Sequence, residues 1–190
     1  MNLDTMRLLG IFVVFLVTGC GQDQVVDGEM NEDRFWSLVE SAKSAAKSTH
    51  DRPNELLPLL EDLSPAELEQ FDAIYMKQLN RSYTWSLWGA AYVMNGGCSD
   101  DCFDYFRDWL ISEGRQTFDA ALAEPDTLAE LPRVYGAELE LFRYVHFELY
   151  EKKVGKMLEP NYEGAPLDPA GEPWDEDEVY ALFPKLARIY

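Results

Sequence analysis

The apolar residues of this chain recur with the period of α-helices over most of its length. Between residues 31 and 46 they stand three and four positions apart, which places them on one side of a helix. They are Phe35, Leu38, Val39, Ala42, Ala45 and Ala46. Asn31 precedes this stripe and can cap the helix, because its side-chain oxygen can accept a hydrogen bond from the first turn. A first helix is therefore predicted to begin after Asn31.

A second strong helix start lies at Ser64-Pro65-Ala66-Glu67. A serine at the cap, a proline at the first helical position and a glutamate at the third together form a capping box. The stripe that follows consists of Leu68, Phe71, Tyr75 and Leu79. Capping and turn residues place further helices at 54–62, 84–94, 99–114, 115–123, 138–153 and 175–183. The helix at 54–62 is predicted to be interrupted at Pro58, since proline cannot donate an intrahelical hydrogen bond.

The connections between these helices define the fold class. Asn95-Gly96-Gly97 ends the helix at 84–94, because glycine readily adopts the positive φ of a helix C-terminus. Alternating runs of β-branched residues are missing after the leader, so no strand is expected. The predicted fold is all-α, a single irregular domain of about six to eight helices. Residues 155–174 are rich in proline and glycine and are predicted to form an ordered C-terminal wrap.

The N-terminus carries the pattern of a bacterial lipoprotein signal. The apolar run at 8–17 is long enough for a signal-peptide core and shorter than the roughly 20 residues of a membrane-spanning helix. It ends in Leu16-Val17-Thr18-Gly19-Cys20, which resembles a lipobox. The resemblance implies diacylglycerol on the Cys20 sulfur, cleavage before Cys20 and acylation of the new amine. Since each acyl methylene contributes about 0.8 kcal/mol of membrane affinity, this modification would anchor the chain.

These signals predict three parts: residues 1–19 as a lipoprotein signal peptide, 20–30 as a flexible tether and 31–190 as the helical domain. The expected location is the cell envelope. In a Gram-negative cell the periplasmic face of the outer membrane is favoured, because Gly21 and not aspartate follows the lipidated cysteine. Asp4 is unusual in a leader region that is normally positive, and translation from Met6 instead of Met1 would remove it. Both starts remain open.

Composition restricts the classes of partner. The formal net charge is −19 at pH 7, from 35 acidic and 16 basic residues. Such a surface repels phosphate backbones and anionic lipid headgroups, which argues against nucleic-acid binding and against membrane contact through basic residues. A partner protein is instead expected to be neutral or cationic. An aromatic content of 13% with 47% hydrophobic residues indicates a folded domain.

Residues 83–109 combine many aromatic residues with a run of aspartates. The aromatic residues are Tyr83, Trp85, Trp88, Tyr92, Phe103, Tyr105, Phe106 and Trp109. On a helix from 99 to 114, one arc contains Cys102, Phe103, Phe106, Trp109 and Leu110, and the opposite arc contains Asp100, Asp101, Asp104 and Asp108. The simplest interpretation is an aromatic core face and a solvated acidic face, with the first two aspartates stabilised by the helix dipole.

The same spacing allows a functional interpretation. Like charges four residues apart cost on the order of a few tenths of a kcal/mol per pair unless a cation lies nearby. Asp100, Asp104 and Asp108 have this spacing, so they could hold an oxygen-liganded cation or an arginine from a partner. Asp100, Asp101 and Asp104 are accordingly weak candidates for catalytic residues. Because the spacing matches no calcium-loop pattern, no metal site and no cofactor are predicted.

The central part of the chain also carries a long, specific string. It runs over residues 85–101 as WSLWGAAYVMNGGCSDD and over residues 103–111 as FDYFRDWLI. With the flanking segments 33–36 and 171–177, it resembles the bacterial domain of unknown function family 4240 (DUF4240). The motif residues are Trp85, Trp88, Gly96, Gly97, Cys98, Ser99, Asp100, Asp101, Phe103 and Trp109. The resemblance implies a helical domain, commonly without a leader and with glycine at position 102, and it implies no activity.

Cys98 and Cys102 stand four residues apart. Residues with this spacing on a helix have Cα atoms about 6 Å apart, which a disulfide can bridge. An exported protein meets oxidants, so a bond can form here, and two free buried thiols are an equal alternative. A redox pair is less favoured, since the spacing is not Cys-x-x-Cys.

His50 and His146 are the only histidines. His50 is expected at a helix end, and His146 lies on the apolar stripe of 138–153, where a hydrogen-bonded core histidine is the favoured interpretation. The chain has no HExxH, Gly-x-Ser-x-Gly, P-loop or paired-cysteine zinc signature. Nothing in the sequence assembles a nucleophile, a base and a group that orients them.

Three functions follow from these observations. The first is a membrane-anchored helical binding or protein-interaction module, which the missing catalytic motifs and the acidic faces favour. The second is a hydrolase or metal-dependent enzyme that uses Asp100, Asp101 and Asp104, with Glu113 and Arg115 nearby. The third is an immunity or inhibitor protein whose acidic surface covers a cationic partner.

Overall fold

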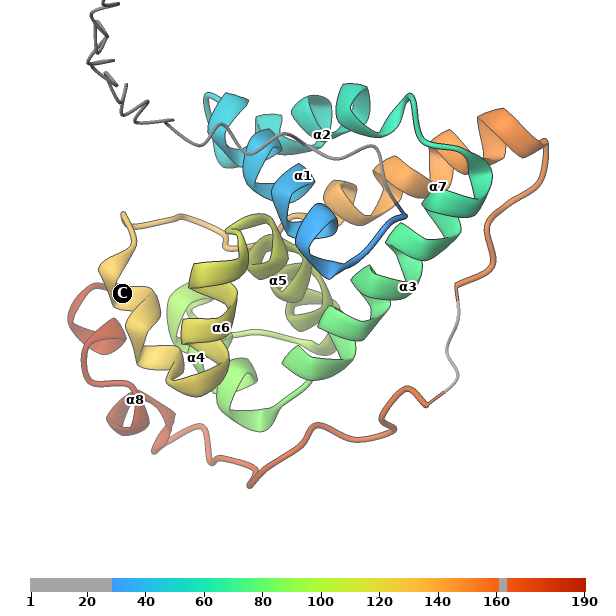
Figure 1. Cartoon of the computed structure of the whole chain (residues 1–190). Helices are drawn as coiled ribbons and strands as arrows, with labels where there is room; N and C mark the ends of the chain where they lie inside the picture. The colour runs from blue at the N-terminus through green and yellow to red at the C-terminus, as the bar shows by residue number, and fades with distance from the viewer. Residues whose placement is uncertain (1–28, 161–163) are drawn as a thin grey trace, which may run out of the picture.

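The structure is a computed structural model that describes residues 29–160 and 164–190 (Figure 1). Its α-helices are α1 (Glu32–Ala45), α2 (Arg52–Leu60), α3 (Pro65–Ser82), α4 (Trp85–Asn95), α5 (Asp100–Ser112), α6 (Arg115–Ala123), α7 (Glu140–Val154) and α8 (Val179–Leu182). Short 3₁₀ helices are η1 (Thr49–Asp51), η2 (Pro125–Glu130) and η3 (Leu186–Arg188). The described residues contain no strand, and the prediction of a single all-α domain is confirmed.

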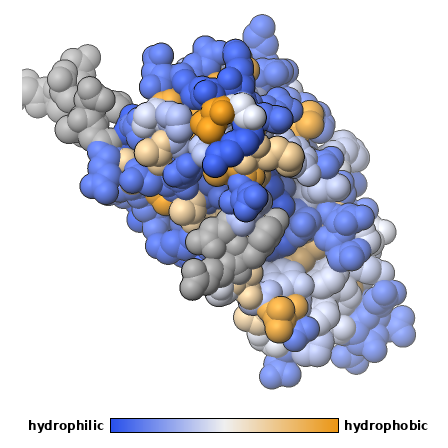
Figure 2. Space-filling view, turned by 90° about the vertical axis from the view of Figure 1, so that its right-hand side faces the viewer, coloured by the Kyte–Doolittle hydropathy of each residue, from blue (hydrophilic) through white to orange (hydrophobic). Residues whose placement is uncertain are grey.

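The face of the domain in Figure 2 is largely hydrophilic, with hydrophobic residues scattered among polar ones, in agreement with the net charge of −19. Within the two described ranges, no helix is both long and apolar enough to cross a membrane. The predicted signal peptide at 1–19, Cys20 and nearly all of the predicted tether at 20–30 lie outside the described residues.

Two helix starts follow the capping residues that the sequence predicts. Asn31 Oδ1 accepts a hydrogen bond from the Arg34 amide over 2.9 Å at the start of α1. At α3, the Ser64 hydroxyl accepts from the Glu67 amide, and the Glu67 carboxylate accepts from the Ser64 amide. These caps satisfy first-turn N–H groups that have no intrahelical acceptor, so local sequence alone determines where both helices begin.

Two predicted helices differ from the structure. The one predicted at 54–62 is α2, which continues through Pro58 without interruption. Pro58 has no amide hydrogen to donate to the Asn54 carbonyl. Both residues are exposed, so water can form a hydrogen bond with that carbonyl instead. The helix predicted at 175–183 is limited to α8. Before it, the Asp175 carboxylate accepts a hydrogen bond from the Asp177 amide and stabilises a turn instead.

Helix α5 lies at the centre of the domain and contacts α1, α3, α4, α6 and α7 (Figure 1). Its aromatic arc is buried as predicted, since Phe103, Phe106 and Trp109 are each at most 1% exposed. Burying one phenylalanine side chain contributes about 1.5–3 kcal/mol. Because the surrounding helices all pack on α5, the residues of its first turn have fixed positions relative to the core.

Residues 164–190 pass beneath α3 and reach α4, which α8 and η3 contact (Figure 1). Ala170 pairs with the junction between α3 and α4: its amide donates to the Tyr83 carbonyl, and its carbonyl accepts from the Trp85 amide, each over 2.9 Å. Four residues later, the Trp174 indole donates to the Trp85 carbonyl over 2.8 Å. The predicted C-terminal wrap is therefore held by specific hydrogen bonds to the start of α4.

Candidate functional site

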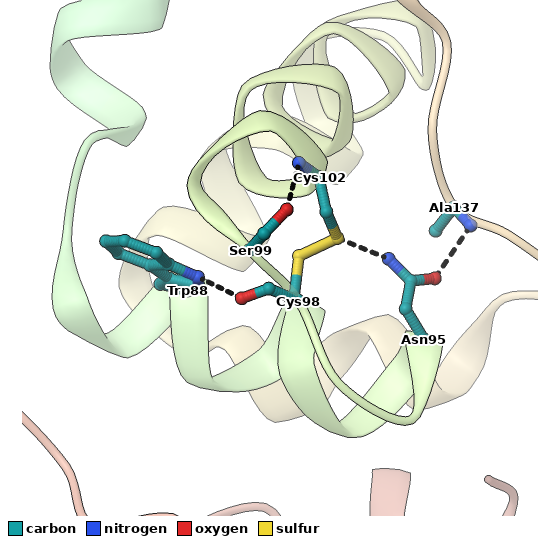
Figure 3. The surroundings of a disulfide bond; sticks show 6 residues. All are labelled: Trp88, Asn95, Cys98, Ser99, Cys102 and Ala137. Atoms are coloured by element: carbon teal, nitrogen blue, oxygen red, sulfur yellow. Dashed lines mark hydrogen bonds between the residues drawn. A yellow bond between two sulfur atoms is a disulfide. The ribbon is translucent and has the colours of Figure 1, made fainter.

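A disulfide bond and three side-chain hydrogen bonds, one of them from the Cys102 amide to the cap residue Ser99, hold the first turn of α5 (Figure 3). Cys98 lies just before the cap residue Ser99 and is bonded to Cys102, with 5.2 Å between the two Cα atoms. The structure thus contains the bond and not two free thiols. The Trp88 indole donates to the Cys98 carbonyl over 2.9 Å, and the Asn95 amide donates to the Cys102 sulfur over 3.4 Å. The start of α5 is therefore tied to α4.

Asn95 extends this connection toward α7. Its Oδ1 accepts a hydrogen bond from the Ala137 amide over 2.9 Å (Figure 3). Two residues on, the Leu139 amide donates to the Tyr105 carbonyl over 3.0 Å. The chain just before α7 is thereby held against α5, and the end of α4, the start of α5 and the start of α7 form one connected unit.

A stack of aromatic rings lies beside this turn. Trp85 and Trp88 have ring centres 5.2 Å apart and planes 8° apart, and Trp88 and Phe103 have centres 5.0 Å apart and planes 9° apart. The Arg107 guanidinium lies over the rings of Tyr83 and Phe103, 4.8 and 5.2 Å from their centres. Each aromatic pair contributes about 0.5–1.5 kcal/mol beyond its buried area, so the stack fixes the position of the arginine.

Next to the stack is a cavity of about 310 Å³, bordered by α3, α4, α5, α7 and residues 165–166. Its apolar lining includes Met76, Leu79, Tyr83, Trp88 and Phe103. Its charged lining consists of Asp100, Asp101, Asp104, Arg107 and Arg143. All three candidate catalytic aspartates thus reach the same cavity, together with two arginines. The volume lies at the lower end of the range of small-molecule sites.

The three aspartates that line the cavity differ in their partners. Asp100 and Asp101 are exposed, and neither forms an ion pair with another described residue. Asp104 is 44% exposed and forms an ion pair with Arg107. Its second carboxylate oxygen lies 3.8 Å from Arg143 Nη1. Two negative charges at the edge of the cavity therefore remain available to a cation, and the third is shared between arginines of the chain itself.

Asp108 is buried, with only 1% of its surface exposed, so its assignment to a solvated face is wrong. The reason is that α7 covers this part of the polar arc. Arg143 Nε donates to Asp108 Oδ1 over 2.9 Å, and the Tyr75 hydroxyl donates to the same oxygen over 2.8 Å. Burial raises the pKa of Asp108 to about 7, and the charge and hydrogen bond of Arg143 and the hydrogen bond from Tyr75 oppose this rise only in part.

The two arginines are held differently. Arg107 Nη1 donates to the Leu79 carbonyl over 3.1 Å, and its Nη2 donates to Asp104. Burial lowers the pKa of Arg107. Burial is also the largest single effect on Arg143 and acts against its charge, but Asp108, Tyr75 and Asp104 together outweigh it and raise the pKa of Arg143. Arg107 Nε and Arg143 Nη2 are buried and have no hydrogen-bond acceptor among the described residues. These two donors are enclosed by the protein.

The arrangement of the aspartates does not favour a metal site. Asp104 lies against Arg107, and Asp108 is bound by Tyr75 and Arg143 in the core. Over the part of the chain that the structure describes, no group of three or more histidine, cysteine, aspartate or glutamate residues could hold a metal ion. The spacing of the aspartates could have suited a cation or an arginine from a partner. At Asp104 and Asp108, arginines of this chain occupy that position instead.

The sequence string at residues 85–101 and 103–111, which resembles a known family, forms much of this region. It supplies the ring stack, the cap residue Ser99, and the glycines Gly96 and Gly97, whose φ angles are 68° and 123°. The model of the family described as "Protein of unknown function (DUF4240)" matches residues 30–152. The chain belongs to this family. Comparisons with curated proteins and with solved structures gave no match.

The match to DUF4240 covers α1 through α6 and most of α7, and therefore nearly all of the cavity lining. Ala165 and Pro166, which border the cavity, lie beyond the matched residues. The segment around Ala170, which pairs with the start of α4, also lies beyond the matched residues. The cavity of this DUF4240 chain is thus completed by its C-terminal wrap.

Glu113 and Arg115 do not lie near the aspartates of the cavity, so their predicted proximity is wrong. They follow the last turn of α5, and a helix of 13 residues has a length of about 20 Å. Glu113 is buried and forms ion pairs with Arg52 over 2.8 Å and Lys43 over 2.9 Å. Arg115 forms an ion pair with Asp33 over 2.6 Å. These residues join α5 and α6 to α1 and α2, which is a structural role.

Neither histidine belongs to the cavity of the DUF4240 domain. His146 is fully buried on α7, and its Nε2 lies 2.9 Å from Asp72 Oδ1. Burial lowers the pKa of His146, although Asp72 acts in the opposite direction. His50 is exposed in η1. The geometry of His146 agrees with a hydrogen-bonded core histidine.

The sequence interpretation missed Arg107 and Arg143. Arg107 stands four residues after Phe103, at the border between the aromatic and acidic arcs of α5. Arg143 stands three residues before His146, at the edge of the apolar stripe of α7. An arginine at the edge of an apolar arc is the signal that could have identified both, because burial of an arginine requires partners.

Proposed function

We propose that this chain is a lipid-anchored binding protein of the bacterial cell envelope. Its binding surface is the acidic edge, which we define as Asp100, Asp101 and Asp104, and its partner is a neutral or cationic protein. The observation that carries the proposal is that Asp100 and Asp101 are adjacent, exposed and without an ion pair among the described residues. They stand on the first turn of α5, which the disulfide between Cys98 and Cys102 closes and which hydrogen bonds from Trp88 and Asn95 connect to α4.

The physical argument concerns charge and order. A net charge of −19 attracts a cationic surface over a distance, and the acidic edge gives that attraction a specific end point. The first turn of α5 is already held by the disulfide and by Trp88, so binding has few groups left to order. Preorganisation of this kind raises affinity because less conformational entropy is lost on association.

The lipoprotein signal supports the location. With lipid on Cys20, residues 20–28 separate the membrane from the first described residue, and nine extended residues reach at most about 30 Å. The partner would therefore lie in the envelope close to the membrane surface. A cationic toxin or enzyme that an acidic inhibitor covers is a more specific form of the same proposal.

The test is capture of partners from detergent-solubilised envelope with the lipidated full chain, using chemical crosslinking and quantitative mass spectrometry. The wild type is compared with the double variant Asp100→Asn/Asp101→Asn. The matched control is Glu61→Gln/Asp62→Asn, which removes two adjacent exposed charges just after α2. A specific partner is expected to be retained by the wild type and the control and lost from the first variant. Equal capture by all three proteins, or no specific partner, contradicts the proposal.

A further inference from the structure

The disulfide between Cys98 and Cys102 closes a very short loop near the surface of the domain. The three residues between the cysteines, Ser99, Asp100 and Asp101, are exposed, and both cysteines are half-buried. Closing so short a loop removes little entropy from the unfolded chain, so the folded domain loses little stability when the bond opens. Accessible disulfides are also the ones that exchange most readily with thiols. Loop length and position therefore suit a bond that opens and closes in the folded protein.

A side-chain donor is held against one of the two sulfurs. The Ala137 amide donates to the Asn95 side chain over 2.9 Å, and only the oxygen Oδ1 can accept this hydrogen bond. The other end of the Asn95 side chain is therefore its amino group Nδ2, which lies 3.4 Å from the Cys102 sulfur (Figure 3). At Cys98 the nearby donor is the Trp88 indole, which binds the carbonyl and not the sulfur. Asn95 thus favours Cys102 alone.

The position of Cys102 in the helix acts in the same direction. Cys102 is the third residue of α5, and its amide donates to the Ser99 hydroxyl, whereas Cys98 precedes this cap residue. The partial positive charge of a helix N-terminus favours negative charge on a cysteine sulfur in this turn. The carboxylates of Asp100 and Asp101 oppose it, but both are exposed, so solvent and salt screen them. Of the two sulfurs, that of Cys102 is better placed to carry a negative charge.

We propose that Cys98 and Cys102 form a thiol–disulfide exchange site whose co-substrate is a dithiol. A thiolate of the dithiol attacks the Cys98 sulfur, the bond between the two cysteines breaks, and its electron pair stays on the Cys102 sulfur. The second thiolate of the dithiol then attacks the mixed disulfide and releases Cys98. The dithiol is oxidised to a disulfide, and its two electrons and two protons convert Cys98 and Cys102 to thiols.

Asn95 is a positioning residue for the first of these steps. A thiolate leaves a disulfide faster when its negative charge is stabilised, and the Nδ2 donor supplies that stabilisation at Cys102. The spacing of the cysteines alone did not favour a redox pair, because it is not Cys-x-x-Cys. The contact with Asn95 adds what the spacing does not show. The inference goes beyond the proposed function, since exchange with a dithiol requires no cationic protein partner.

The first test is the rate at which dithiothreitol, a neutral dithiol, reduces the full chain in detergent. Asn95→Ala removes the donor and is expected to slow reduction about three- to tenfold, because the departing sulfur loses a hydrogen bond to its developing charge. Asn95→Asp keeps the acceptor for Ala137 but places a negative charge beside the sulfur, and it should slow reduction at least as much. Asn54→Asp makes the same change at an exposed position of α2 and should react as the wild type does.

The second test locates the sulfur that is attacked. The wild type is treated briefly with 2-mercaptoethanol, free thiols are blocked with N-ethylmaleimide, and the modified residues are located by peptide mass spectrometry. The mercaptoethanol adduct is expected on Cys98 and the maleimide on Cys102, in at least about threefold excess over the reverse pattern. Asn95→Ala should reduce this excess, which a merely structural role of Asn95 would leave unchanged. Modification of Cys20 is counted separately, so the result does not depend on lipidation.

Three results would overturn the inference: resistance of the folded chain to dithiothreitol, reduction of both Asn95 variants at the wild-type rate, or an adduct found equally or mainly on Cys102. If the Asn95 variants do not fold by circular dichroism, the adduct map of the wild type decides the question. Both tests contain no other protein and are therefore independent of partner capture. Exchange without a captured partner removes only the proposed function, and capture without exchange removes only this inference.

Discussion

Asp108 Oδ1 accepts hydrogen bonds from both Arg143 Nε and the Tyr75 hydroxyl, at 2.9 and 2.8 Å. Three helices meet at this buried oxygen, because Tyr75 belongs to α3, Asp108 to α5 and Arg143 to α7. The network lies directly behind the cavity, since Arg143 also lines it. Stability and the shape of the cavity therefore depend on the same three side chains.

We expect Asp108→Asn to remove a pH-dependent part of the free energy of unfolding. Burial raises the pKa of Asp108 from 3.8 to about 7, so the folded state binds this proton more tightly than the unfolded chain. Through this group, the free energy of unfolding falls as the pH rises from about 4 to about 7, by at most about 4 kcal/mol, and changes little above that range.

The measurement is urea denaturation of the wild type and of Asp108→Asn between about pH 4 and pH 8. The difference in stability between them should shift in favour of the variant as the pH rises. Asp62→Asn, an exposed aspartate, is the control and should follow the wild type. Parallel pH profiles for the wild type and Asp108→Asn would rule out a raised pKa.

Breaking the bond between Cys98 and Cys102 is expected to destabilise the domain only slightly. Because the closed loop is so short, the loss should be on the order of 2 kcal/mol or less. The local effect should be larger, since Asn95 and Trp88 also depend on this turn. Hydrogen exchange should accelerate in the first turn of Cys98→Ser/Cys102→Ser, with little change in α6. Alkylation of either cysteine in unreduced, denatured protein would contradict the bond.

Gly89→Ala is expected to loosen the C-terminal wrap. A Cβ at position 89 would lie 2.7 Å from the Phe183 ring and 3.1 Å from the Trp174 ring. Overpacking costs about 1–3 kcal/mol, and the better helix propensity of alanine offsets about 1 kcal/mol of this. Limited proteolysis should then cut faster within residues 164–178. Ser86→Ala, at an exposed position of α4, is the control, and equal cleavage of both variants would disprove the steric argument.

Cys20→Ser is expected to move the protein from the membrane fraction to the soluble fraction and to abolish labelling with radioactive palmitate. The reason is that the lipobox cysteine is the expected attachment site of the acyl chains. Cell fractionation with immunoblotting and metabolic labelling measure both effects. A Cys98→Ser/Cys102→Ser protein should remain in the membrane fraction. Palmitate labelling that persists in Cys20→Ser would refute lipidation at this residue.

The parts of the fold that depend on nearby residues could be predicted from the sequence. The caps at Asn31 and Ser64 and the buried aromatic arc of α5 are examples, because their partners lie within a few positions. The surroundings of Asp108 could not be predicted, since its partner Arg143 is 35 residues away on α7. Helical spacing places a residue on an arc, but only packing determines which other helix covers that arc.

Ala170 also sets a lower limit on the length of chain that can fold as a unit. A polypeptide that ends at residue 152, where the family match ends, would leave the Tyr83 carbonyl and the Trp85 amide without their partners. It would also expose the side of α4 that Trp174 covers. The cooperative unit therefore extends beyond the family boundary, and relatives shortened there would need another segment to protect the start of α4.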